Sequence, residues 1–361
     1  MSPEVAAAAR QFADGEVARA ERVAGGHIHE SWHVTPADRP PRPDLLLQRL
    51  NTRVFTTPDA LIANAVSVTR HLAGGAGPGA GAAMLELLPA ADSGGFHWID
   101  DSGAWWRAFR YIENTTSLTR AVTVRHAAET GRAFGRFHRA MARYDGAALR
   151  ETLPHFHDTP RRLRDLAEAA GADRAGRARG VRAELDAIRG FASAAGRLEA
   201  LRASGRLPGR IAHNDAKIGN VLFDAAAETA LCVIDLDTVM PGLLLHDFGD
   251  MIRSTAATGE EDDARRGAVE VSVPCYRAIL EGFLEETGDL LTAVERDHLA
   301  DAALQVTLEQ AARFLTDHLD GDRYYRVNRP NHNLDRAKAQ LSLLGSLVAK
   351  EDELRGASAA V

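Results

Sequence analysis

One stretch near the middle of the chain places chemically active side chains at short, regular spacing. Asp215, Lys217 and Asn220 come directly before an apolar run, residues 221–223, that is typical of a short buried strand. After a turn, a second apolar run ends at Asp235. Two carboxylates, an ammonium group and an amide at the ends of neighbouring strands are the groups that phosphoryl transfer uses.

The spacing also predicts a role for each residue. The pattern H-x-D-x-x-x-x-N, from His213 to Asn220, is typical of a kinase catalytic loop. Asp215 is expected to accept the hydrogen bond of the acceptor hydroxyl, with Lys217 beside the transferred phosphate. Asn220 and Asp235 are predicted to bind Mg²⁺, which prefers hard oxygen ligands. The alternative is an ordinary turn between strands, since Asp and Asn both favour turns.

The composition is that of an ordinary soluble globular chain. Of its 361 residues, 45% are hydrophobic and 26% are charged, and the formal net charge is −7. This mild acidity argues against nucleic acid or an anionic membrane as the main partner. Cys232 and Cys275 are too few for a disulfide framework. With no signal peptide and no apolar run near the ~20 residues of a membrane span, we expect a cytoplasmic protein.

The N-terminal region predicts a hairpin. Residues 17–34 read as a strand, a turn at Gly25 and Gly26, and a second strand. Glycine lets backbone amides approach a phosphate closely, so a hairpin of this kind can cover nucleotide phosphates. Taken alone, the two glycines are equally typical of an ordinary hairpin turn.

The third predicted strand departs from the usual kinase pattern. LLLQRL carries Gln48 and Arg49 where a lysine is expected, and the next helix, around Asn64, contains no glutamate to pair with it. We predict that Gln48 and Asn64 form the polar pair instead, with Arg49 as an alternative cation. Further on, RYIENTTSL reads as a hinge, where backbone groups of Tyr111 and Ile112 are expected to bond the adenine edge.

Together these motifs resemble the aminoglycoside phosphotransferase-like kinase superfamily. Within it, the subgroup that the chain resembles most is that of the N-acetylhexosamine 1-kinases. The likeness implies an α+β, bilobal, protein-kinase-like fold, with an antiparallel-sheet nucleotide-binding lobe over residues 1–112 and a larger, mainly helical catalytic and substrate-binding lobe over residues 113–361. It rests on LLLQRLN, IENTTS, FHDTPRR, HNDAKIGNVLFD, IDLDTVMPG, RFLTDHLDGDRYYRV and HNLDRAKAQL.

The resemblance implies ATP and Mg²⁺ as cofactors and an N-acetylhexosamine, GlcNAc or GalNAc, as the acceptor, phosphorylated on its anomeric hydroxyl. It gives Asp215 the catalytic role and Asn220 and Asp235 the metal roles.

A sugar acceptor needs fixed donors, acceptors and an aromatic ring. Arg313 and Tyr324, near a long polar loop, are therefore predicted to contact it, as is Asp237, two residues past Asp235 on the same strand face.

Two other interpretations stay open. The same chemistry could serve glucosamine or another amino sugar, an aminoglycoside, choline or homoserine, because the sequence offers four carboxylates for a cationic acceptor, Asp237, Asp247, Asp250 and Glu309. A nucleotide-binding pseudokinase is the alternative from another class. The missing lysine favours it, whereas the intact set of catalytic-loop residues argues against it. The sequence leaves the oligomeric state open.

Overall fold

The structure is a computed structural model of the 361-residue chain. It divides into two compact units, of which unit 1 comprises residues 1–115 and 145–153 and unit 2 comprises residues 116–144 and 154–361. An antiparallel sheet in unit 1 and a mainly helical unit 2 confirm the α+β, protein-kinase-like fold. The residues described are 1–13, 15–23, 28–37, 43–75, 85–263, 265 and 267–359.

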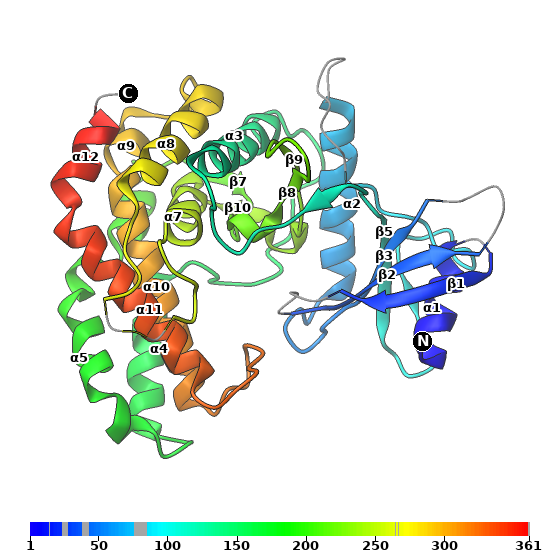
Figure 1. Ribbon diagram of the computed structural model, residues 1–361, viewed down its shortest axis with the longest axis horizontal. Coiled ribbons are helices and arrows are strands. Elements are labelled where there is room, and N and C mark those ends of the chain that lie inside the picture. Colours follow the sequence, from blue (N-terminus) through cyan, green and yellow to red (C-terminus); the bar gives the residue numbers. More distant parts are fainter. Residues whose placement is uncertain are drawn as a thin grey trace. The chain divides into compact units, whose positions relative to one another are not determined.

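Unit 1 is built on a sheet in the order β1-β2-β3-β5-β4 (Figure 1). Antiparallel pairing of β1 with β2 confirms the hairpin predicted over residues 17–34, whereas Gly25 and Gly26 lie outside the described residues. The strands are β1 Val17–Arg22, β2 Glu30–Pro36, β3 Leu45–Arg49, β4 Trp98–Ile99 and β5 Trp105–Arg110.

Alternation along β3 directs successive side chains to opposite faces of this sheet. Leu45 and Leu47 are buried with the apolar face of α1, Pro3–Ala13. Leu46 packs instead with the cluster that contains Ala65 of α2, Pro58–Gly75. Each face of the sheet is therefore covered by one helix.

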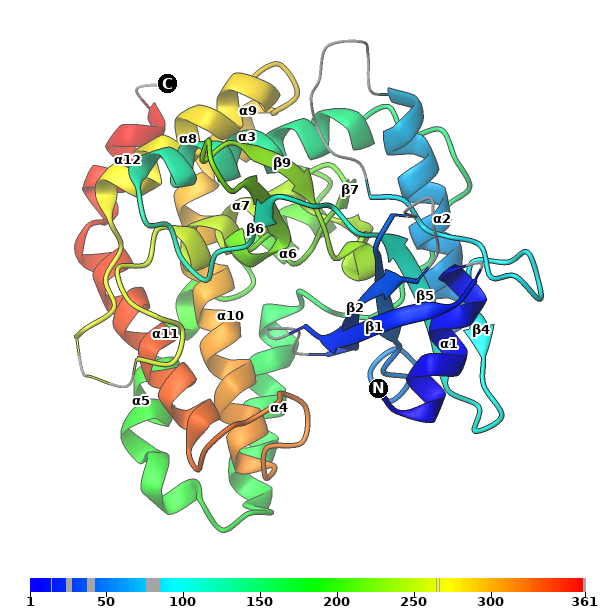
Figure 2. The same ribbon diagram turned by 45° about the vertical axis from the view of Figure 1, so that its right-hand side comes forward.

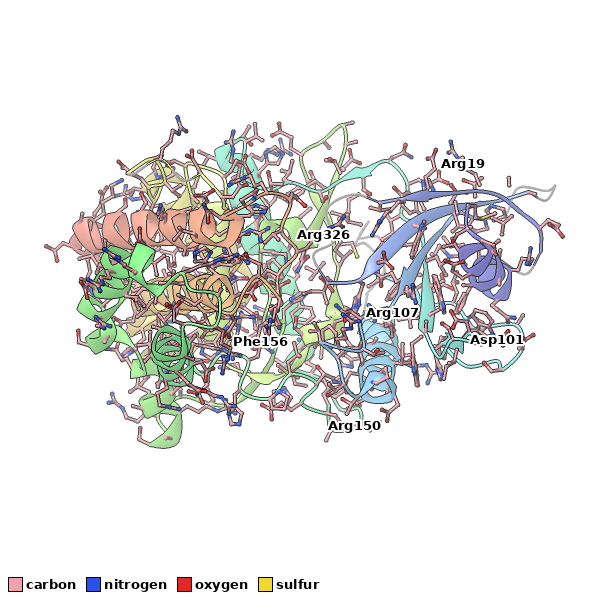
Figure 3. The ribbon with its side chains drawn as sticks, turned by 90° about the horizontal axis from the view of Figure 1, so that it is seen from below. Arg19, Asp101, Arg107, Arg150, Phe156 and Arg326 are labelled. Carbon is pink, nitrogen blue, oxygen red and sulfur yellow. The ribbon has the colours of Figure 1, made fainter. Side chains whose placement is uncertain are left out.

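The predicted pairing of Gln48 with Asn64 is wrong. Gln48 accepts a hydrogen bond at 2.9 Å from Nε of Arg107, its register partner on β5, and donates to Ser31 at 3.2 Å. Arg107, labelled in Figure 3, is only 1% exposed. A residue directly across the sheet is nearer than one on the covering helix, which is why the cross-strand partner is selected. Arg49 lies beside Glu30.

Asn64 has a different task within unit 1. Its side chain donates to the carbonyl oxygen of Arg150 at 2.7 Å and accepts from the Arg150 N–H at 3.0 Å. These two hydrogen bonds to the backbone of one residue tie residues 145–153 to α2. Arg150 is labelled in Figure 3.

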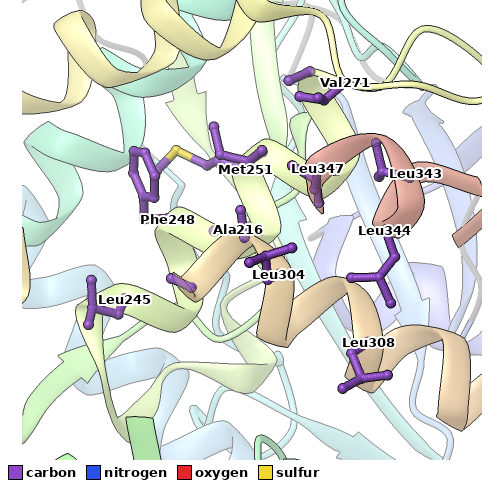
Figure 4. Close-up of a cluster of buried hydrophobic side chains, with 14 of the residues drawn as sticks. Ala216, Leu245, Phe248, Met251, Val271, Leu304, Leu308, Leu343, Leu344 and Leu347 are labelled. Atoms are coloured by element: carbon purple, nitrogen blue, oxygen red, sulfur yellow. The ribbon is translucent and has the colours of Figure 1, made fainter. Parts of the chain in front are cut away.

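Unit 2 is organised around α10, which packs against α7 and α11 (Figures 1 and 2). Figure 4 shows the leucines, Phe248 and Met251 that fill the space between these helices. Of the described residues, none belongs to a helix long and apolar enough to span a bilayer. The helices are α3 Val124–Met141, α4 Thr159–Ala172, α5 Arg182–Gly190, α6 Arg197–Ala203, α7 Leu244–Thr255, α8 Val273–Thr287, α9 Ala293–Asp297, α10 Leu299–Leu319, α11 His332–Ala349 and α12 Glu351–Ala359.

Short strands complete unit 2. β7, Arg210–Ala212, pairs with β10, Met240–Gly242, and β8, Val221–Asp224, pairs with β9, Ala230–Val233, all antiparallel. The two apolar runs of the sequence are therefore adjacent strands. β6, Thr115–Thr116, lies at the boundary of the two units.

Candidate active site

The predicted catalytic residues lie on two loops that run side by side. The first, residues 213–220, leads from β7 to β8, and the second, residues 234–239, leads from β9 to β10. Because β7 pairs with β10 and β8 with β9, both ends of the two loops are fixed together. The loops are also bonded directly, since the Ile234 N–H donates to the Asn220 carbonyl oxygen at 2.9 Å and the ring of His213 lies 3.0 Å from the Ile234 carbonyl oxygen.

Asp215, Lys217 and Asn220 meet at one carboxylate oxygen. The ammonium of Lys217 donates to Oδ2 of Asp215 at 2.7 Å, and the amide nitrogen of Asn220 donates to the same oxygen at 2.8 Å. Oδ1 of Asp215 accepts no hydrogen bond from the described residues, and the side chain is 26% exposed. One carboxylate oxygen is therefore held in place while the other is available to a ligand.

Asp215 and Lys217 are both charged at neutral pH. Burial by itself raises the pKa of Asp215, but the ammonium of Lys217 outweighs it and holds that pKa well below its usual range. Burial likewise lowers the pKa of Lys217, and the carboxylates of Asp215 and Asp235 more than reverse the effect. Asp215 is thus ionised and Lys217 protonated, and Asp235 is close enough to Lys217 to influence it.

Asp235 lies at the start of a 3₁₀ turn and not within the predicted strand. The strand β9 ends at Val233, and Asp235 has a left-handed backbone with a φ of 62°, directly before a 3₁₀ turn over Leu236–Thr238. The prediction that Asp237 shares a strand face with Asp235 is therefore wrong, because Asp237 is buried within that turn. Aspartate tolerates the left-handed region better than most residues, which allows the strand to stop there.

The donor atoms at Asn220 and Asp235 fit a hard cation. The Asn220 amide nitrogen donates to the backbone carbonyl and to the carboxylate of Asp215, both at 2.8 Å, which leaves the amide oxygen as a possible ligand. The described residues include no cluster of three His, Cys, Asp or Glu side chains placed to hold a metal. One carboxylate and one amide suit Mg²⁺, which takes its remaining ligands from phosphates and water.

Asp247 on α7 fixes the backbone of the catalytic loop. Its two carboxylate oxygens accept the N–H groups of His213 and Asn214, each at 2.7 Å, and His138 lies 2.8 Å away. Burial alone raises the pKa of Asp247, but the contact with His138 outweighs it, so the pKa is lowered. The sequence offered Asp247 as a carboxylate for a cationic acceptor, and only the fold reveals this anchoring role.

A second anchor reaches the loop from FHDTPRR, a segment that the sequence marked for its family resemblance without assigning a role to His157. His157 lies with Nε2 3.0 Å from the carbonyl oxygen of Asn214 and Nδ1 3.1 Å from Glu309. Glu309 and His157 are 152 positions apart in the chain, so no local pattern marks the pair.

Asp250, another carboxylate proposed for a cationic acceptor, accepts a hydrogen bond from Nε of Arg253 at 2.7 Å.

The predicted acceptor residues Arg313 and Tyr324 lie close together. The guanidinium of Arg313 is 4.6 Å from the ring centre of Phe156, labelled in Figure 3, and 5.9 and 5.8 Å from those of Tyr324 and Tyr325. The loop that carries the tyrosines is ordered by Asp317, whose carboxylate accepts N–H groups from both at 2.8 and 2.9 Å.

The predicted nucleotide contacts in unit 1 have protein partners of their own. The Tyr111 N–H donates to the Asp44 carbonyl oxygen at 2.8 Å, and its ring stacks on His33 at 3.9 Å. The Ile112 carbonyl oxygen accepts from Thr115 at 2.9 Å. Roles for Tyr111, Ile112 and Gln48 in binding a nucleotide stay predictions.

The sequence pattern of the phosphotransferase enzyme family, APH, matches residues 19–281, well over half of the chain. The chain belongs to this family. The phosphotransferase also resembles solved structures along nearly its whole length.

Three of these structures define the common fold. A microcompartment-associated aminopropanol kinase is 13% identical, with a TM-score of 0.61 and 98% of each chain covered. An aminoglycoside phosphotransferase from Alicyclobacillus acidocaldarius is 15% identical, with a TM-score of 0.61 and coverage of 100% of this chain and 97% of that one. Spectinomycin phosphotransferase APH(9)-Ia, in complex with ADP and spectinomycin, is 12% identical, with a TM-score of 0.58 and coverage of 95% and 99%.

Proposed function

We propose that this phosphotransferase is an ATP-dependent small-molecule kinase that phosphorylates the anomeric hydroxyl of an N-acetylhexosamine. The observation that carries the proposal is the state of Asp215, with one oxygen held by Lys217 and Asn220 and the other open. ATP as the donor is supported by the similar spectinomycin phosphotransferase, whose structure contains ADP. The sugar acceptor rests on the resemblance of the sequence to N-acetylhexosamine 1-kinases.

In this mechanism Asp215 aligns the attacking oxygen. Its Oδ1 accepts the hydrogen bond of the acceptor hydroxyl, which points a lone pair of that oxygen at the phosphorus. A carboxylate with so low a pKa is a weak base, so the proton moves to it as the new O–P bond forms and the bond from the γ-phosphorus to the bridging oxygen breaks, with ADP as the leaving group. Lys217 keeps the carboxylate in place and balances charge near the transferred group. Mg²⁺ held by Asn220 and Asp235 would neutralise the phosphate oxygens.

The surroundings of Arg313 favour a neutral polar acceptor over a cationic one. Arg313 itself would repel an ammonium group, while its N–H groups suit the acetamido oxygen of a sugar. The rings of Phe156, Tyr324 and Tyr325 offer apolar faces beside it. Asp247, Asp250 and Glu309 are occupied by the partners described above, which reduces the support for choline, homoserine or an aminoglycoside.

The test is ATP consumption with a panel of acceptors that includes GlcNAc, GalNAc, glucosamine, an aminoglycoside, choline and homoserine. We expect turnover with the N-acetylhexosamines, accompanied by loss of the reducing end. Turnover with a retained reducing end would refute anomeric transfer, and a preference for choline or homoserine would refute the sugar. If nucleotide binds and no acceptor is phosphorylated, the pseudokinase interpretation is favoured instead.

Asp215→Asn should lower kcat by about 10³-fold or more, because the amide cannot accept the proton, while nucleotide affinity stays near that of the wild type. Steady-state kinetics and calorimetric titration with ATP measure the two effects. Asp297→Asn, the same change at an exposed site on α9, is the matched control. Near-normal turnover of Asp215→Asn would remove the assignment.

A further inference from the structure

We propose that His157 is a positioning residue that is held as an imidazolium and, in that charged form, fixes the backbone of the catalytic loop directly before Asp215. The proposal rests on the proposed function only for its kinetic consequence. Its structural part concerns the charge of one buried ring and can be measured without any substrate.

The two neighbours of the His157 ring are both hydrogen-bond acceptors. Nδ1 lies 3.1 Å from a carboxylate oxygen of Glu309, and Nε2 lies 3.0 Å from the carbonyl oxygen of Asn214. A neutral imidazole carries a single N–H, so one of these contacts would bring two lone pairs together. Only the imidazolium donates to both. The His157 side chain is 7% exposed and that of Glu309 is 2% exposed, so water cannot easily replace either partner.

The charge of the ring agrees with its surroundings. Burial by itself lowers the pKa of His157, but Glu309 outweighs burial and raises it. Burial likewise raises the pKa of Glu309, and His157 brings it down to about 2. The other charged or titratable groups that face the ring are Arg313 on α10 and Asp250 and His246 on α7.

His246 is the neutral member of a ring pair. Its ring centre is 4.5 Å from that of His157, and neither of its nitrogens has a hydrogen-bond partner among the described residues. Burial and the nearby charge of His157 lower the pKa of His246 to about 3. Of these two imidazoles in contact, His246 is therefore neutral and His157, the ring that donates to both acceptors, carries the positive charge.

The bonded carbonyl belongs to a residue with a left-handed backbone. Asn214 has a φ of 62°, a region that asparagine adopts more readily than most residues with a Cβ. Its N–H is held by Asp247 and its carbonyl oxygen by His157, so both backbone polar groups are bonded to side chains of opposite charge. Because Asn214 precedes Asp215, any relaxation of its backbone rotates the catalytic carboxylate.

Glu309 is itself held in place. Its second carboxylate oxygen accepts from the Thr159 hydroxyl at 3.0 Å, and that hydroxyl accepts from Gln305 at 3.2 Å. The chain of contacts therefore runs from α10 through Glu309 and His157 to the loop. Loss of the imidazolium proton as the pH rises through the raised pKa of His157 would leave one N–H for two acceptors, which breaks the link between Glu309 and the Asn214 carbonyl at one of its two contacts. We expect kcat to fall on this alkaline side while the KM of the acceptor stays constant, since His157 is not placed on the substrate.

The first experiment is ¹⁵N NMR of the full-length protein labelled at its 14 histidines, with His157 assigned by its absence in His157→Gln. Two protonated ring nitrogens on His157 at pH 7 are expected. A neutral tautomer at that pH would overturn the inference, whether or not an acceptor has been found. In Glu309→Gln, in which an isosteric amide replaces the carboxylate, the ring should become neutral at a lower pH.

The second experiment measures kcat against pH with the preferred acceptor. His157→Gln should lose roughly tenfold to a hundredfold in kcat at pH 7, and its kcat should no longer fall as the pH rises through the pKa of His157. In Glu309→Gln this fall in kcat should occur at a lower pH. His298→Gln is the matched control and should keep the wild-type profile, because the His298 ring lies 2.8 Å from the Val294 carbonyl oxygen and 4.0 Å from Asp301 and bonds no other side chain among the described residues. Unchanged profiles in an active enzyme would refute the positioning role, whereas inactivity of the wild type would refute the proposed function alone.

Discussion

At the scale of single residues, the predicted catalytic loop, residues 213–220, is held in place by buried side chains. Asp247 accepts two consecutive backbone N–H groups, from His213 and Asn214. These N–H groups belong to the two residues directly before Asp215, so they cannot turn to solvent without moving Asp215. A buried carboxylate whose two oxygens both accept backbone N–H groups holds the loop in place.

Asp247→Asn tests this role. The amide nitrogen would face a backbone N–H, so one buried donor loses its acceptor, and we expect a loss of about 1–3 kcal/mol in the free energy of unfolding. kcat should fall with it, because the loop loses an anchor. Urea denaturation and steady-state kinetics measure the two effects, and Asp297→Asn at an exposed position should change the stability by less than about 0.5 kcal/mol. An unaltered stability in Asp247→Asn would contradict the anchoring role.

At the scale of elements, α3 and α8 approach so closely that their contact requires glycine. A Cβ on Gly131 would collide with the backbone of Ile279, and one on Gly282 would collide with the carbonyl oxygen of Ala128. Backbone cannot retreat as a flexible side chain can, so the helices would have to separate. This contact matters for the site, because α3 carries His138, which meets Asp247.

Gly282→Ala should therefore lower the stability of the protein by about 1–3 kcal/mol through overpacking. Gly345→Ala on α11 is the matched control, since its added methyl group would meet no atom. There the same change should stabilise by about 0.4–1 kcal/mol, because alanine loses less backbone entropy on folding. Thermal unfolding of both variants compares them directly, and shifts of the same sign would show that the close approach is not what the glycine at 282 provides.

At the scale of the whole molecule, buried charges make the stability dependent on pH. The pKa of Glu309 falls from 4.5 to about 2 on folding, because His157 outweighs the effect of burial. A carboxylate with a depressed folded pKa binds protons more tightly in the unfolded chain. Its contribution is therefore complete above about pH 4.5 and disappears as the pH falls towards 2.

Glu309→Gln should reduce the loss of unfolding free energy that occurs as the pH falls from about 4.5 towards 2. The wild type should lose on the order of 3 kcal/mol between pH 4.5 and 2 through this group, and the variant should lose correspondingly less. Unfolding free energies from chemical denaturation at a series of pH values provide the measurement. Glu168→Gln, at an exposed carboxylate on α4, should follow the wild-type curve. An equal loss in Glu309→Gln would show that other groups govern acid unfolding.

The sequence by itself determined what lies within reach of a few residues. Asp215, Lys217 and Asn220 fall within six consecutive positions of one loop, and the strand that follows limits where their side chains can go. The two apolar runs on either side of the turn likewise predicted the strand pair, since a short apolar run beside a turn is local information. The family resemblance rests on the same local motifs.

Only the tertiary structure decided which distant residues meet. Gln48 bonds Arg107 across the sheet, Asn64 bonds Arg150, and His157 bonds Glu309, over separations of 59, 86 and 152 residues. Such partners depend on which elements become neighbours, and no periodicity or motif encodes that choice. The groups proposed to act on the phosphate were therefore visible in the sequence, while the charged side chains that hold their backbone were selected by the packing of α7 and α10 around the loop.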